Sequence, residues 1–435
     1  MRVSVLGTGY LGATHAACLA AWGHDVVGVD SNAERIATLS TGRAPFREPG
    51  LDRLLGAGVS SGRLRFATAL DSARDADVHF VCVGTPQCAD NHAADLSALW
   101  GLVDELAPML DRSCVVVGKS TVPVGTATKV GERLRRSAPA GDGVEVAWNP
   151  EFLREGCAVE DSLHPDRLVL GVETDTAQLR LREVYAGLLA DGVPLVVTDL
   201  ATAELAKVAA NTMLAARISL VNLLAEVCEA ANADVADLAT ILGYDERIGS
   251  SFLSPGLGFG GGCLPKDIRA FVARAEELGV SRSTDLVHAV DDVNMRQRVR
   301  AVEKTTDLVG GDLRGRRLCL LGAAFKAGSD DVRDSPALDV ASRLHRGDAD
   351  VVVHDPLALA NARRAHPELQ YEPDLATACA GADAIVVLTD WDDYSALDPV
   401  ALSAVVRQPR VLDARLALDA EKWRAAGWDV SVMGR

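Results

Sequence analysis

The N-terminal stretch of the chain, residues 2–12, reads RVSVLGTGYLG. It joins a short apolar run to the pattern Gly7-x-Gly9-x-x-Gly12, and an Ala-rich segment follows. A strand, a glycine-rich turn and a helix in this order begin a dinucleotide-binding unit when an acidic residue ends the next strand. Asp30 stands at that place, at the end of DVVGVD and 18 residues after Gly12. The sequence therefore predicts a Rossmann-type nucleotide-binding fold at the N-terminus.

Each glycine of this pattern has its own task in such a fold. The first permits the tight turn, the second lets a pyrophosphate approach the backbone, and the third lets the helix pack on the strand. Asp30 would accept hydrogen bonds from a ribose 2′-hydroxyl and repel a 2′-phosphate, which favours NAD over NADP. Arg35 is near in the sequence and either contacts the ribose or is solvated. A glycine-rich turn without a ligand is the alternative interpretation.

The alternation of strands and helices continues beyond this unit. Further apolar segments that read as strands lie at 78–83, 114–118, 144–148 and 168–172. Strands that alternate with helical patterns indicate a parallel α/β sheet. Residues 201–232 contain neither Pro nor Gly and repeat apolar residues at helical spacing. We expect one long helix there, of the kind that joins domains or forms a dimer seam.

A second strand–helix pattern starts near residue 317. Its segments are a strand at 317–322, a helix at 336–346 and strands at 350–354, 384–388 and 410–412. We therefore predict an α/β fold with two Rossmann-like, doubly wound domains joined by a long central helix and a helical middle region. The expected boundaries are 1–199 for the NAD-binding domain, 200–300 for a helical dimerisation domain and 301–435 for the second Rossmann-like domain.

The composition limits the classes of function. The chain has 435 residues, and its 44 Lys and Arg against 61 Asp and Glu give a net charge of −17. Such a field repels polyphosphates, so we expect neither nucleic acid nor an anionic membrane as a partner. Apolar runs of about 18 residues, which would predict a membrane span, are absent from the sequence. Residues 1–7 read as a strand and not as a signal peptide.

Nine cysteines are scattered along the chain without a Cys-x-x-Cys pair. An odd, scattered set is typical of a reducing cytoplasm and predicts neither a disulfide framework nor a zinc site. We therefore expect a cytoplasmic protein without a bound metal, in which most cysteines are small buried apolar residues.

One cysteine has a setting that suggests chemistry. Cys263 lies in FGGGCLPKD, residues 259–267. The glycines bring backbone close to a ligand, and Pro265 suits the first turn of a helix. A thiol at a helix N-terminus ionises more readily, and Lys266 and Asp267, at i+3 and i+4, would face the same way as Cys263. This set suits covalent catalysis at a carbonyl. A buried cysteine in a glycine-rich loop, followed by two surface charges, is an equally good interpretation.

Two pairs of polar residues have helical spacing. Glu151 and Glu155 are four residues apart in NPEFLREG, one helical turn, and paired carboxylates can divide general-base and water-positioning roles. In isolation, a solvated surface turn is the simpler interpretation of this segment. Lys207 and Asn211 are also four apart, on the long helix, where Lys207 is either partly buried or extends to solvent.

Thr121 belongs to KSTVPVGT, residues 119–126, directly after the strand at 114–118. An α/β sheet places its ligand crevice at such a strand end. Thr121 would orient a water or hydroxyl there, or it caps a helix.

Together these motifs resemble one family. The set consists of Gly7 to Gly12 with Tyr10, Val83-Gly84-Thr85-Pro86, Lys119 to Pro123, Asn149 to Gly156, Lys207 with Asn211, Gly260 to Asp267, Phe325-Lys326 and Asp331-x-Arg333-x-Ser335-Pro336-Ala337. In order and content it resembles that of the UDP-glucose/GDP-mannose dehydrogenases, which oxidise the C6 alcohol of a nucleotide sugar to a carboxylate. The resemblance covers residues 1 to about 415. It implies two Rossmann-like domains, the second for the nucleotide sugar, joined by a long helix that makes a homodimer.

The resemblance also implies a reaction. One site would remove two hydrides, to two successive NAD molecules, without releasing the aldehyde. Cys263 would attack the C6 aldehyde to give a thiohemiacetal, and the second hydride transfer would leave a thioester that water hydrolyses. A thiolate suits this task because sulfur both adds to the aldehyde and leaves from the acyl intermediate.

Residue roles follow from the same resemblance. The catalytic set would be Cys263 as nucleophile, Glu151 as general base, Lys207 and Asn211 at the oxyanion, and Asp267 and Thr121 for water or proton handling. The residues that would contact NAD are Gly7, Gly9, Tyr10, Leu11, Gly12, Asp30, Arg35, Thr85, Pro86, Ser120, Thr121, Glu155, Lys266 and Arg333. Those that would contact the nucleotide sugar are Glu151, Phe152, Leu153, Arg154, Glu155, Lys207, Asn211, Arg247, Phe252, Ser254, Phe259, Gly260, Lys326 and Arg415. Of these, Arg247 would act across the dimer interface, on the partner's pyrophosphate.

Departures from the family pattern concern the choice of substrate. Phe259 stands where many members have Tyr, KAGSDD at 326–331 replaces KPNTDD, and His354 replaces a Tyr before Asp-Pro. HPDR at 164–167 resembles the glucose-type branch. We expect UDP-glucose as the substrate, with dTDP-glucose as a competitor. The base, the hexose, the pathway and any assembly beyond a dimer stay open.

Three other functions are alternatives. The same chemistry could act on GDP-mannose or a UDP-N-acetylhexosamine. A catalytically silent nucleotide-sugar sensor would have no need of Cys263, Lys207, Asn211, Glu151 and Asp267. A two-electron 3-hydroxyacid dehydrogenase has no use for Cys263 and leaves the second α/β domain unexplained.

Overall fold

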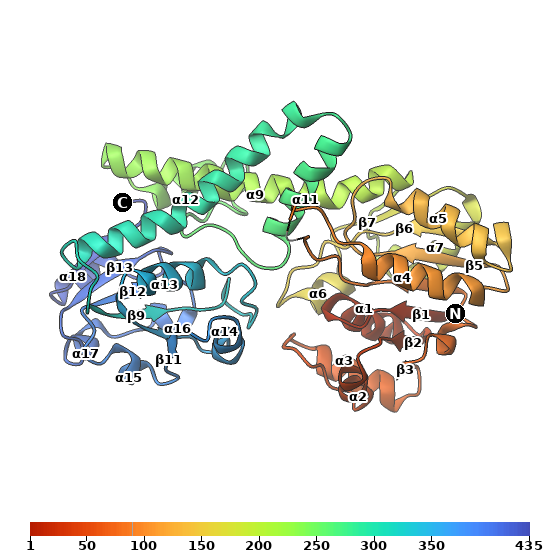
Figure 1. The fold of residues 1–435 in the computed structure, drawn as a ribbon, viewed down its shortest axis with the longest axis horizontal. Coiled ribbons are helices and arrows are strands. Elements are labelled where there is room, and N and C mark those ends of the chain that lie inside the picture. The colour runs from red at the N-terminus through yellow and green to blue at the C-terminus, as the bar shows by residue number, and fades with distance from the viewer. Residues whose placement is uncertain (89) are drawn as a thin grey trace. The chain divides into compact units, whose positions relative to one another are not determined.

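A computed structural model describes residues 1–88 and 90–435 (Figure 1). The chain forms two compact units, Met1–Ala210 with Arg269–Leu278, and Asn211–Ile268 with Gly279–Arg435. Helices α9 (Leu200–Ala231) and α11 (Leu264–Glu277) each contribute residues to both units. The division into three domains at 199/200 and 300/301 stays a prediction.

The first unit is built on a sheet of eight strands in the order β3-β2-β1-β4-β5-β6-β7-β8. The strands are β1 (Arg2–Leu6), β2 (Asp25–Val29), β3 (Leu64–Ala67), β4 (Val78–Val81), β5 (Cys114–Gly118), β6 (Val144–Trp148), β7 (Leu168–Val172) and β8 (Leu195–Thr198). All neighbours are parallel except β6 and β7, which are antiparallel. The predicted α/β sheet is confirmed, and its single antiparallel pair is a feature that strand–helix alternation does not reveal.

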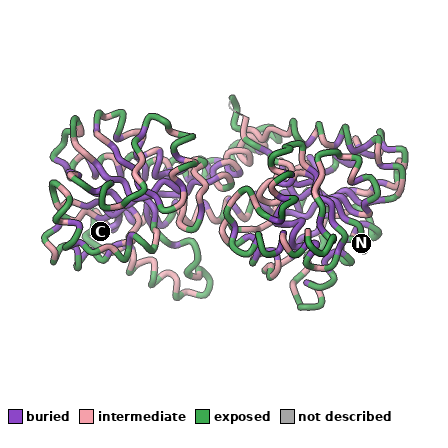
Figure 2. The backbone as a smooth tube through the Cα atoms, turned by 90° about the horizontal axis from the view of Figure 1, so that it is seen from below, coloured by how far each residue is buried: buried purple, intermediate pink, exposed green. Residues whose placement is uncertain are grey.

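Helices cover both faces of this sheet. One apolar core holds α1 (Tyr10–Ala21), α3 (Leu51–Ser60), α6 (Ala158–Leu163), α7 (Asp175–Val184) and α8 (Ala186–Ala190). The opposite core holds α4 (Ser97–Leu106), α5 (Thr126–Ser137) and the start of α9, and α2 (Ala33–Ser40) follows β2. Successive residues alternate between the cores, with Val5 in the first and Leu6 in the second. The central strands β4, β5 and β6 are buried along nearly their whole length, so they read as continuous apolar runs. Figure 2 shows buried (purple) backbone in the interior of each unit.

The second unit has a parallel sheet of six strands in the order β11-β10-β9-β12-β13-β14. The strands are β9 (Arg317–Leu321), β10 (Asp350–His354), β11 (Gln370–Tyr371), β12 (Ala384–Val387), β13 (Arg410–Asp413) and β14 (Asp429–Val432). Helices α12 (Asp285–Leu308), α13 (Pro336–Arg346) and α14 (Leu359–Ala365) pack on one face. On the other pack α15 (Leu375–Cys379), α16 (Asp392–Ser395), α17 (Pro399–Ser403) and α18 (Ala420–Ala425), while α10 (Val235–Gly243) follows α9. The second Rossmann-like pattern is thereby confirmed.

The long helix predicted at 201–232 is confirmed as α9. By length and composition alone, α9 is apolar enough to cross a membrane, a test that core helices of water-soluble proteins also pass. Its first turns carry Glu204 and Lys207, both buried, and both are bonded to neighbours in the first unit. These contacts attach the first turns of α9 to the first unit.

Candidate active site

The glycine pattern at residues 7–12 forms the turn between β1 and α1. Gly7 has a φ of +91°, a left-handed conformation that favours glycine. A Cβ on Gly12 would lie 1.8 Å from the carbonyl oxygen of Gly7, so only glycine lets α1 pack this closely. A Cβ on Gly9 would meet no described atom within 4 Å, which leaves space beside the first N–H groups of α1. This cradle fits the pyrophosphate of a dinucleotide.

Asp30 follows β2 and lies beside this turn. Its carboxylate accepts hydrogen bonds from the Thr8 amide (2.8 Å), the Asn32 amide (2.9 Å) and Nη1 of Arg35 (2.8 Å). Burial acts to raise the pKa of Asp30, but these hydrogen bonds outweigh it and lower that pKa. Asp30 is therefore an anion fixed beside the cradle. Of the two interpretations of Arg35, the structure shows neither, since Arg35 is ion-paired with Asp30.

The segment 151–155 does not form the helical turn that the spacing of Glu151 and Glu155 suggests. Glu151 and Glu155 are not a helical turn apart, because residues 151–154 are not helical and α6 begins only at Ala158. Two local features prevent the helix. A carboxylate oxygen of Glu151 accepts the Leu153 amide (2.6 Å), and Gly156 has a left-handed φ of +84°.

Sequence reasoning missed Glu48, which holds this segment in place. The Gly156 amide donates to Oε2 of Glu48 and to the hydroxyl of Tyr10, both at 2.9 Å. The Tyr10 hydroxyl in turn donates to Glu48, and burial together with that carboxylate raises the pKa of Tyr10. Tyr10, expected among the NAD contacts, thus ties α1 to the 151–156 segment. A buried Glu in a loop has no pattern that would identify it from sequence.

Lys207 and Glu151 form an ion pair in the first unit. Nζ of Lys207 lies 2.9 Å from Oε1 of Glu151, and their side chains are only 6% and 13% exposed. The Lys207 ammonium lies 5.8 Å from the ring centroid of Phe152, and the Arg167 guanidinium lies 3.8 Å from the same ring. Of the two interpretations of Lys207, the buried one is confirmed.

A buried network lies next to this pair and was also missed. Nζ of Lys119 donates to Oδ1 of Asn149 (2.9 Å), and the Tyr185 hydroxyl donates to the same oxygen (2.6 Å). Nδ2 of Asn149 donates to the Val169 carbonyl (2.9 Å), so both the oxygen and the nitrogen of the amide are hydrogen-bonded. Burial lowers the pKa of Lys119. Asn149 directly precedes the 150–156 segment, and the network fixes where that segment begins.

In the predicted loop after β5, Ser120 and Thr121 are fixed by hydrogen bonds between hydroxyl groups and backbone carbonyls. The Ser120 hydroxyl donates to the Val83 carbonyl (2.6 Å), and the Thr85 hydroxyl donates to the Thr121 carbonyl (2.7 Å). The alternative role of Thr121 as a helix cap is wrong, because α5 begins at Thr126 with Gly125 at its N-cap. Thr121 is half-buried.

Glu204 of α9 caps α5 instead. Its carboxylate accepts the Gly125 amide at 2.7 Å and the Ala127 amide at 2.6 Å. Burial raises the pKa of Glu204 to about 6, although these amides act to lower it. Arg274 of α11 holds the same loop by donating to the Val124 carbonyl (3.0 Å). The sequence feature that could have identified Glu204 is a charged residue within an Ala-rich helix.

In the second unit, Cys263 stands directly before α11. The helix predicted there is confirmed, and the Asp267 amide donates to the Cys263 carbonyl (2.9 Å). Cys263 is exposed, so its interpretation as a buried residue is wrong. Asp267 is buried and accepts Nδ2 of Asn211 (2.6 Å) and Nζ of Lys266 (2.6 Å). The two charges after the cysteine are thus an internal pair and not ordinary surface charges.

Arg415 is half-buried close to the loop that precedes Cys263. Its Nε donates to the Leu388 carbonyl (2.9 Å) and its Nη1 to the Gly258 carbonyl (3.3 Å). Its Nη2 is buried without a hydrogen-bond partner among the described residues. Burial lowers the pKa of Arg415. A guanidinium whose Nη2 is buried and unused suits an anionic or carbonyl ligand.

The remaining candidates occupy varied positions. Arg247 is 88% exposed and paired with Asp245, and Arg333 is exposed and paired with Asp331. Lys326 is half-buried, with its ammonium 5.6 Å from the Phe325 ring. Half-buried or exposed positions are also found for Leu11, Pro86, Leu153, Arg154, Glu155, Phe252 and Ser254, while Phe259 and Gly260 are buried. Within the first unit lie Glu151, Lys207 and Thr121, and within the second Asn211, Cys263 and Asp267.

Three consecutive parts of the chain match models of a single family. Residues 1–189 match the NAD binding domain of the UDP-glucose/GDP-mannose dehydrogenase family, residues 201–296 its central domain and residues 319–420 its UDP binding domain.

Relatives and solved structures agree with these matches. A UDP-glucose 6-dehydrogenase of Rhizobium meliloti is 41% identical, with all of both chains covered, and one of Haloferax volcanii is 43% identical over 92% of this chain and 93% of its own. The structure is similar to that of a UDP-glucose dehydrogenase from Pyrobaculum islandicum, with a TM-score of 0.91 and 36% identity over 99% of this chain and 96% of that one. It is also similar to a UDP-D-ManNAc dehydrogenase from Pyrococcus horikoshii, with a TM-score of 0.88 and 26% identity over 100% and 99%.

Proposed function

The chain belongs to the UDP-glucose/GDP-mannose dehydrogenase family and is an NAD-dependent oxidoreductase, and from this premise we propose that it oxidises the C6 alcohol of UDP-glucose to the carboxylate of UDP-glucuronate. Relatives at 36–43% identity carry the name UDP-glucose 6-dehydrogenase. The observation that carries the proposal is the exposed Cys263 at the start of α11, one turn before Asp267, which Asn211 holds.

The first unit supports NAD as the hydride acceptor. The cradle formed by Gly7, Gly9 and Gly12 would hold the pyrophosphate, and the anionic Asp30 would accept the adenosine ribose. Bound there, NAD⁺ supplies the chemistry of hydride acceptance, which is needed twice in the reaction. Ser120, Thr121 and Arg333 are proposed as further contacts.

The four-electron oxidation proceeds through a covalent intermediate on the Cys263 sulfur. Removal of a hydride from C6 and a proton from its hydroxyl gives the aldehyde. The Cys263 thiolate adds to the aldehyde carbon, and the oxygen that becomes negative would be stabilised by Lys207 and Asn211. Removal of the second hydride from that carbon restores its C=O bond as a thioester. Glu151 would then take a proton from the water that attacks the thioester, the C–S bond breaks, and Cys263 leaves as a thiolate.

The test is an NADH-release panel with UDP-glucose, dTDP-glucose, GDP-mannose and a UDP-N-acetylhexosamine. We expect two NADH per sugar and the highest kcat/KM with UDP-glucose. One NADH per sugar would contradict the thioester route and favour a simple dehydrogenase. A higher kcat/KM with another nucleotide sugar would keep the chemistry and change the substrate.

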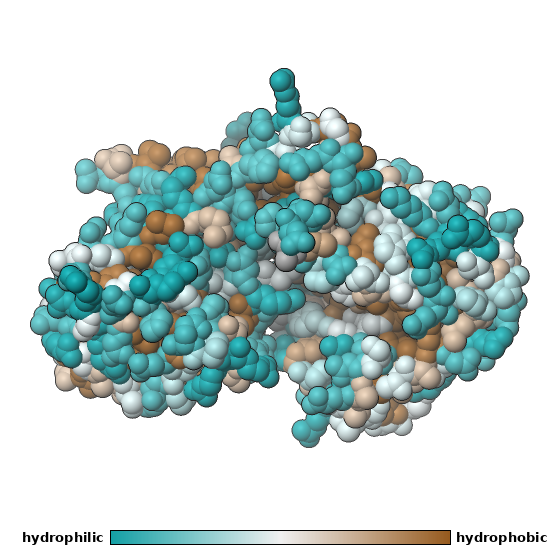
Figure 3. Space-filling model, viewed as in Figure 1, coloured by the Kyte–Doolittle hydropathy of each residue, from teal (hydrophilic) through white to brown (hydrophobic). Residues whose placement is uncertain are grey.

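We also propose that the chain acts as a homodimer through α9. Its exposed apolar residues Met213, Leu220, Leu223 and Val227 are 41–67% exposed and recur at helical spacing. Figure 3 shows apolar (brown) side chains gathered along α9. An apolar stripe of this kind is typical of a helix seam between subunits. The scattered cysteines support a cytoplasmic location, which subcellular fractionation would test.

Two variants test the dimer separately from the site. Leu220→Asp should convert the protein to a monomer, as measured by light scattering after size-exclusion chromatography. Arg247→Ala should leave the dimer intact and raise the KM for the nucleotide sugar. The exposed Arg247 would contact the pyrophosphate of the nucleotide sugar that is bound in the partner subunit. An unchanged KM would remove the proposed role of Arg247.

A further inference from the structure

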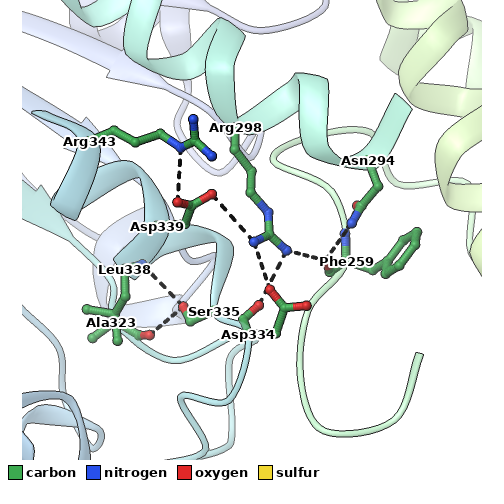
Figure 4. Close-up of polar contacts among 9 residues, drawn as sticks. All are labelled: Phe259, Asn294, Arg298, Ala323, Asp334, Ser335, Leu338, Asp339 and Arg343. Carbon is green, nitrogen blue, oxygen red and sulfur yellow. Dashed lines mark hydrogen bonds and ion pairs between the residues drawn. The ribbon is translucent and has the colours of Figure 1, made fainter. Parts of the chain in front are cut away.

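Arg298 of α12 joins two loops of the second unit (Figure 4). Its side chain is only 2% exposed. Nη2 donates to the Phe259 carbonyl (3.2 Å), and Nη1 donates to Oδ1 of Asp334 (2.8 Å). Nη1 also lies 3.5 Å from Oδ2 of Asp339. The guanidinium therefore contacts the loop before Cys263, the turn at Asp334 and helix α13 at the same time.

Asn294, one helical turn before Arg298, also binds the backbone of Phe259. Its Oδ1 accepts the Phe259 amide (2.7 Å), and its Nδ2 donates to the Phe259 carbonyl (3.1 Å). Asn294 is fully buried. Both backbone polar groups of Phe259 are thus bound by side chains of a single helix, which leaves this residue little freedom.

The two loops also contact each other directly. A Cβ on Gly260 would lie 2.3 Å from the carbonyl oxygen of Asp334, so the backbones meet where only glycine fits. The Gly261 amide donates to the Arg333 carbonyl (2.9 Å). Asp334 has a left-handed φ of +43°, which a non-glycine residue adopts only when its neighbours hold it there. Arg298 supplies that hold through both the carboxylate and the carbonyl of Asp334.

We propose that Arg298, together with Asn294, is a positioning residue that sets the Cys263 loop and the Arg333 turn as one element. The inference rests on the proposed function, in which Cys263 attacks the substrate and Arg333 contacts NAD. The nucleophile and the cofactor contact would then be placed relative to each other by one buried side chain. A forked guanidinium suits this task because it donates in two directions from one plane, which an ammonium does not.

A purely structural role for Arg298 is the alternative, and Arg343 provides the matched control. Nε of Arg343 also pairs with Asp339 (2.9 Å), and Arg343 contacts neither loop in the contacts that Figure 4 draws. Arg343→Met therefore disturbs the same carboxylate without disturbing the link. Arg298→Lys keeps the charge and loses the fork. Asp334→Asn is the second test variant, because it keeps Arg298 and tolerates the left-handed backbone.

The experiment measures three properties of the full-length variants. These are the melting temperature, kcat with KM for NAD⁺ and UDP-glucose, and the rate of alkylation of Cys263 by iodoacetamide, followed by peptide mass spectrometry. Cys157 is exposed in the first unit and serves as the internal reference for alkylation. The alkylation ratio requires no substrate, so it tests positioning even if the proposed function fails.

We expect Arg298→Lys to lower kcat about tenfold to a hundredfold, since small misplacements at a reacting centre have effects of this size. The ratio of Cys263 to Cys157 alkylation should change by about threefold or more, because it depends on the surroundings of the thiol. Asp334→Asn should shift both readouts in the same direction, and Arg343→Met should leave them unchanged. Wild-type values of both readouts in Arg298→Lys and Asp334→Asn, or equal effects in Arg343→Met, would overturn the proposal. Wild-type protein that releases no NADH with any nucleotide sugar would refute the proposed function alone.

Discussion

The Lys207 ammonium lies 2.9 Å from a carboxylate oxygen of Glu151, and both side chains are almost fully buried. The pair connects α9 to the non-helical segment 151–154. Glu151 also accepts the Leu153 amide (2.6 Å), so one carboxylate fixes both the fold of its own segment and the position of the lysine. The residues proposed to stabilise the oxyanion and to activate water are therefore partners before substrate binds.

Replacing Lys207 by Met should destabilise the protein by roughly 3–5 kcal/mol, because it leaves the Glu151 charge buried without its partner. It should also lower kcat by about a hundredfold or more if Lys207 stabilises the oxyanion. Urea denaturation measures the first effect and NADH release the second.

The double variant Lys207→Met, Glu151→Gln is the control for this pair. Removing both charges should restore part of the lost free energy of unfolding without restoring turnover. A single variant as stable as the wild type would show that the pair contributes nothing to folding.

Cys263→Ser should abolish net turnover or trap a covalent intermediate, because an alkoxide is a poorer leaving group than a thiolate. NAD binding, measured by calorimetry, should be unchanged, since Cys263 is not itself among the proposed NAD contacts and the glycine pattern that would hold the pyrophosphate lies in the first unit. Cys157→Ser is the matched control, an exposed cysteine outside the proposed chemistry. Near-normal turnover by Cys263→Ser would remove the nucleophile assignment.

Asp30→Ser should shift cofactor preference toward NADP. The variant loses the anion that repels a 2′-phosphate and releases Arg35, which is paired with Asp30 at 2.8 Å. We expect the ratio of kcat/KM for NADP to that for NAD to rise about tenfold or more, which corresponds to ~1.4 kcal/mol. Asp30→Ser with Arg35→Ala separates the two causes: a ratio that stays high would show that loss of the anion suffices. An unchanged ratio in the single variant would contradict the role of Asp30.

Glu204 predicts a specific pH dependence of stability. Burial raises its pKa from 4.5 to about 6 in the folded protein. The folded state therefore binds this proton more tightly than the unfolded state. The stabilisation that this gives is complete below about pH 4.5 and is lost as the pH rises through about 6.

The comparison variant for this effect is Glu204→Gln, which does not titrate. The free energy of unfolding of the wild type, relative to that of Glu204→Gln, should fall by about 2 kcal/mol between roughly pH 4 and pH 7.5. Urea denaturation at several pH values measures it. A constant difference across this range would show that Glu204 does not titrate as its burial implies.

Much of the site could be predicted from the sequence, because the sequence patterns that indicate it are local. The glycine pattern with Asp30 spans three consecutive elements, while the helix that starts after Cys263 and the spacing of Lys207 and Asn211 each concern a single helix. The helical turn that the spacing of Glu151 and Glu155 suggests is not formed, because contacts that the spacing does not reveal shape this segment. Glu151 bonds to its own segment, and Gly156 is held by Glu48, more than a hundred residues earlier in the chain.

By itself, the sequence determined the two Rossmann-like folds, the long helix, the cofactor and the position of Cys263 at a helix start, because apolar periodicity and turn chemistry act over a few residues. The tertiary structure alone decided which polar groups are buried together. Arg298 with Phe259, Lys119 with Asn149 and Glu204 with the N-terminus of α5 are such pairs. A buried polar group must find a partner wherever the packed core supplies one, and the identity of that partner depends on the whole fold and not on neighbours in sequence.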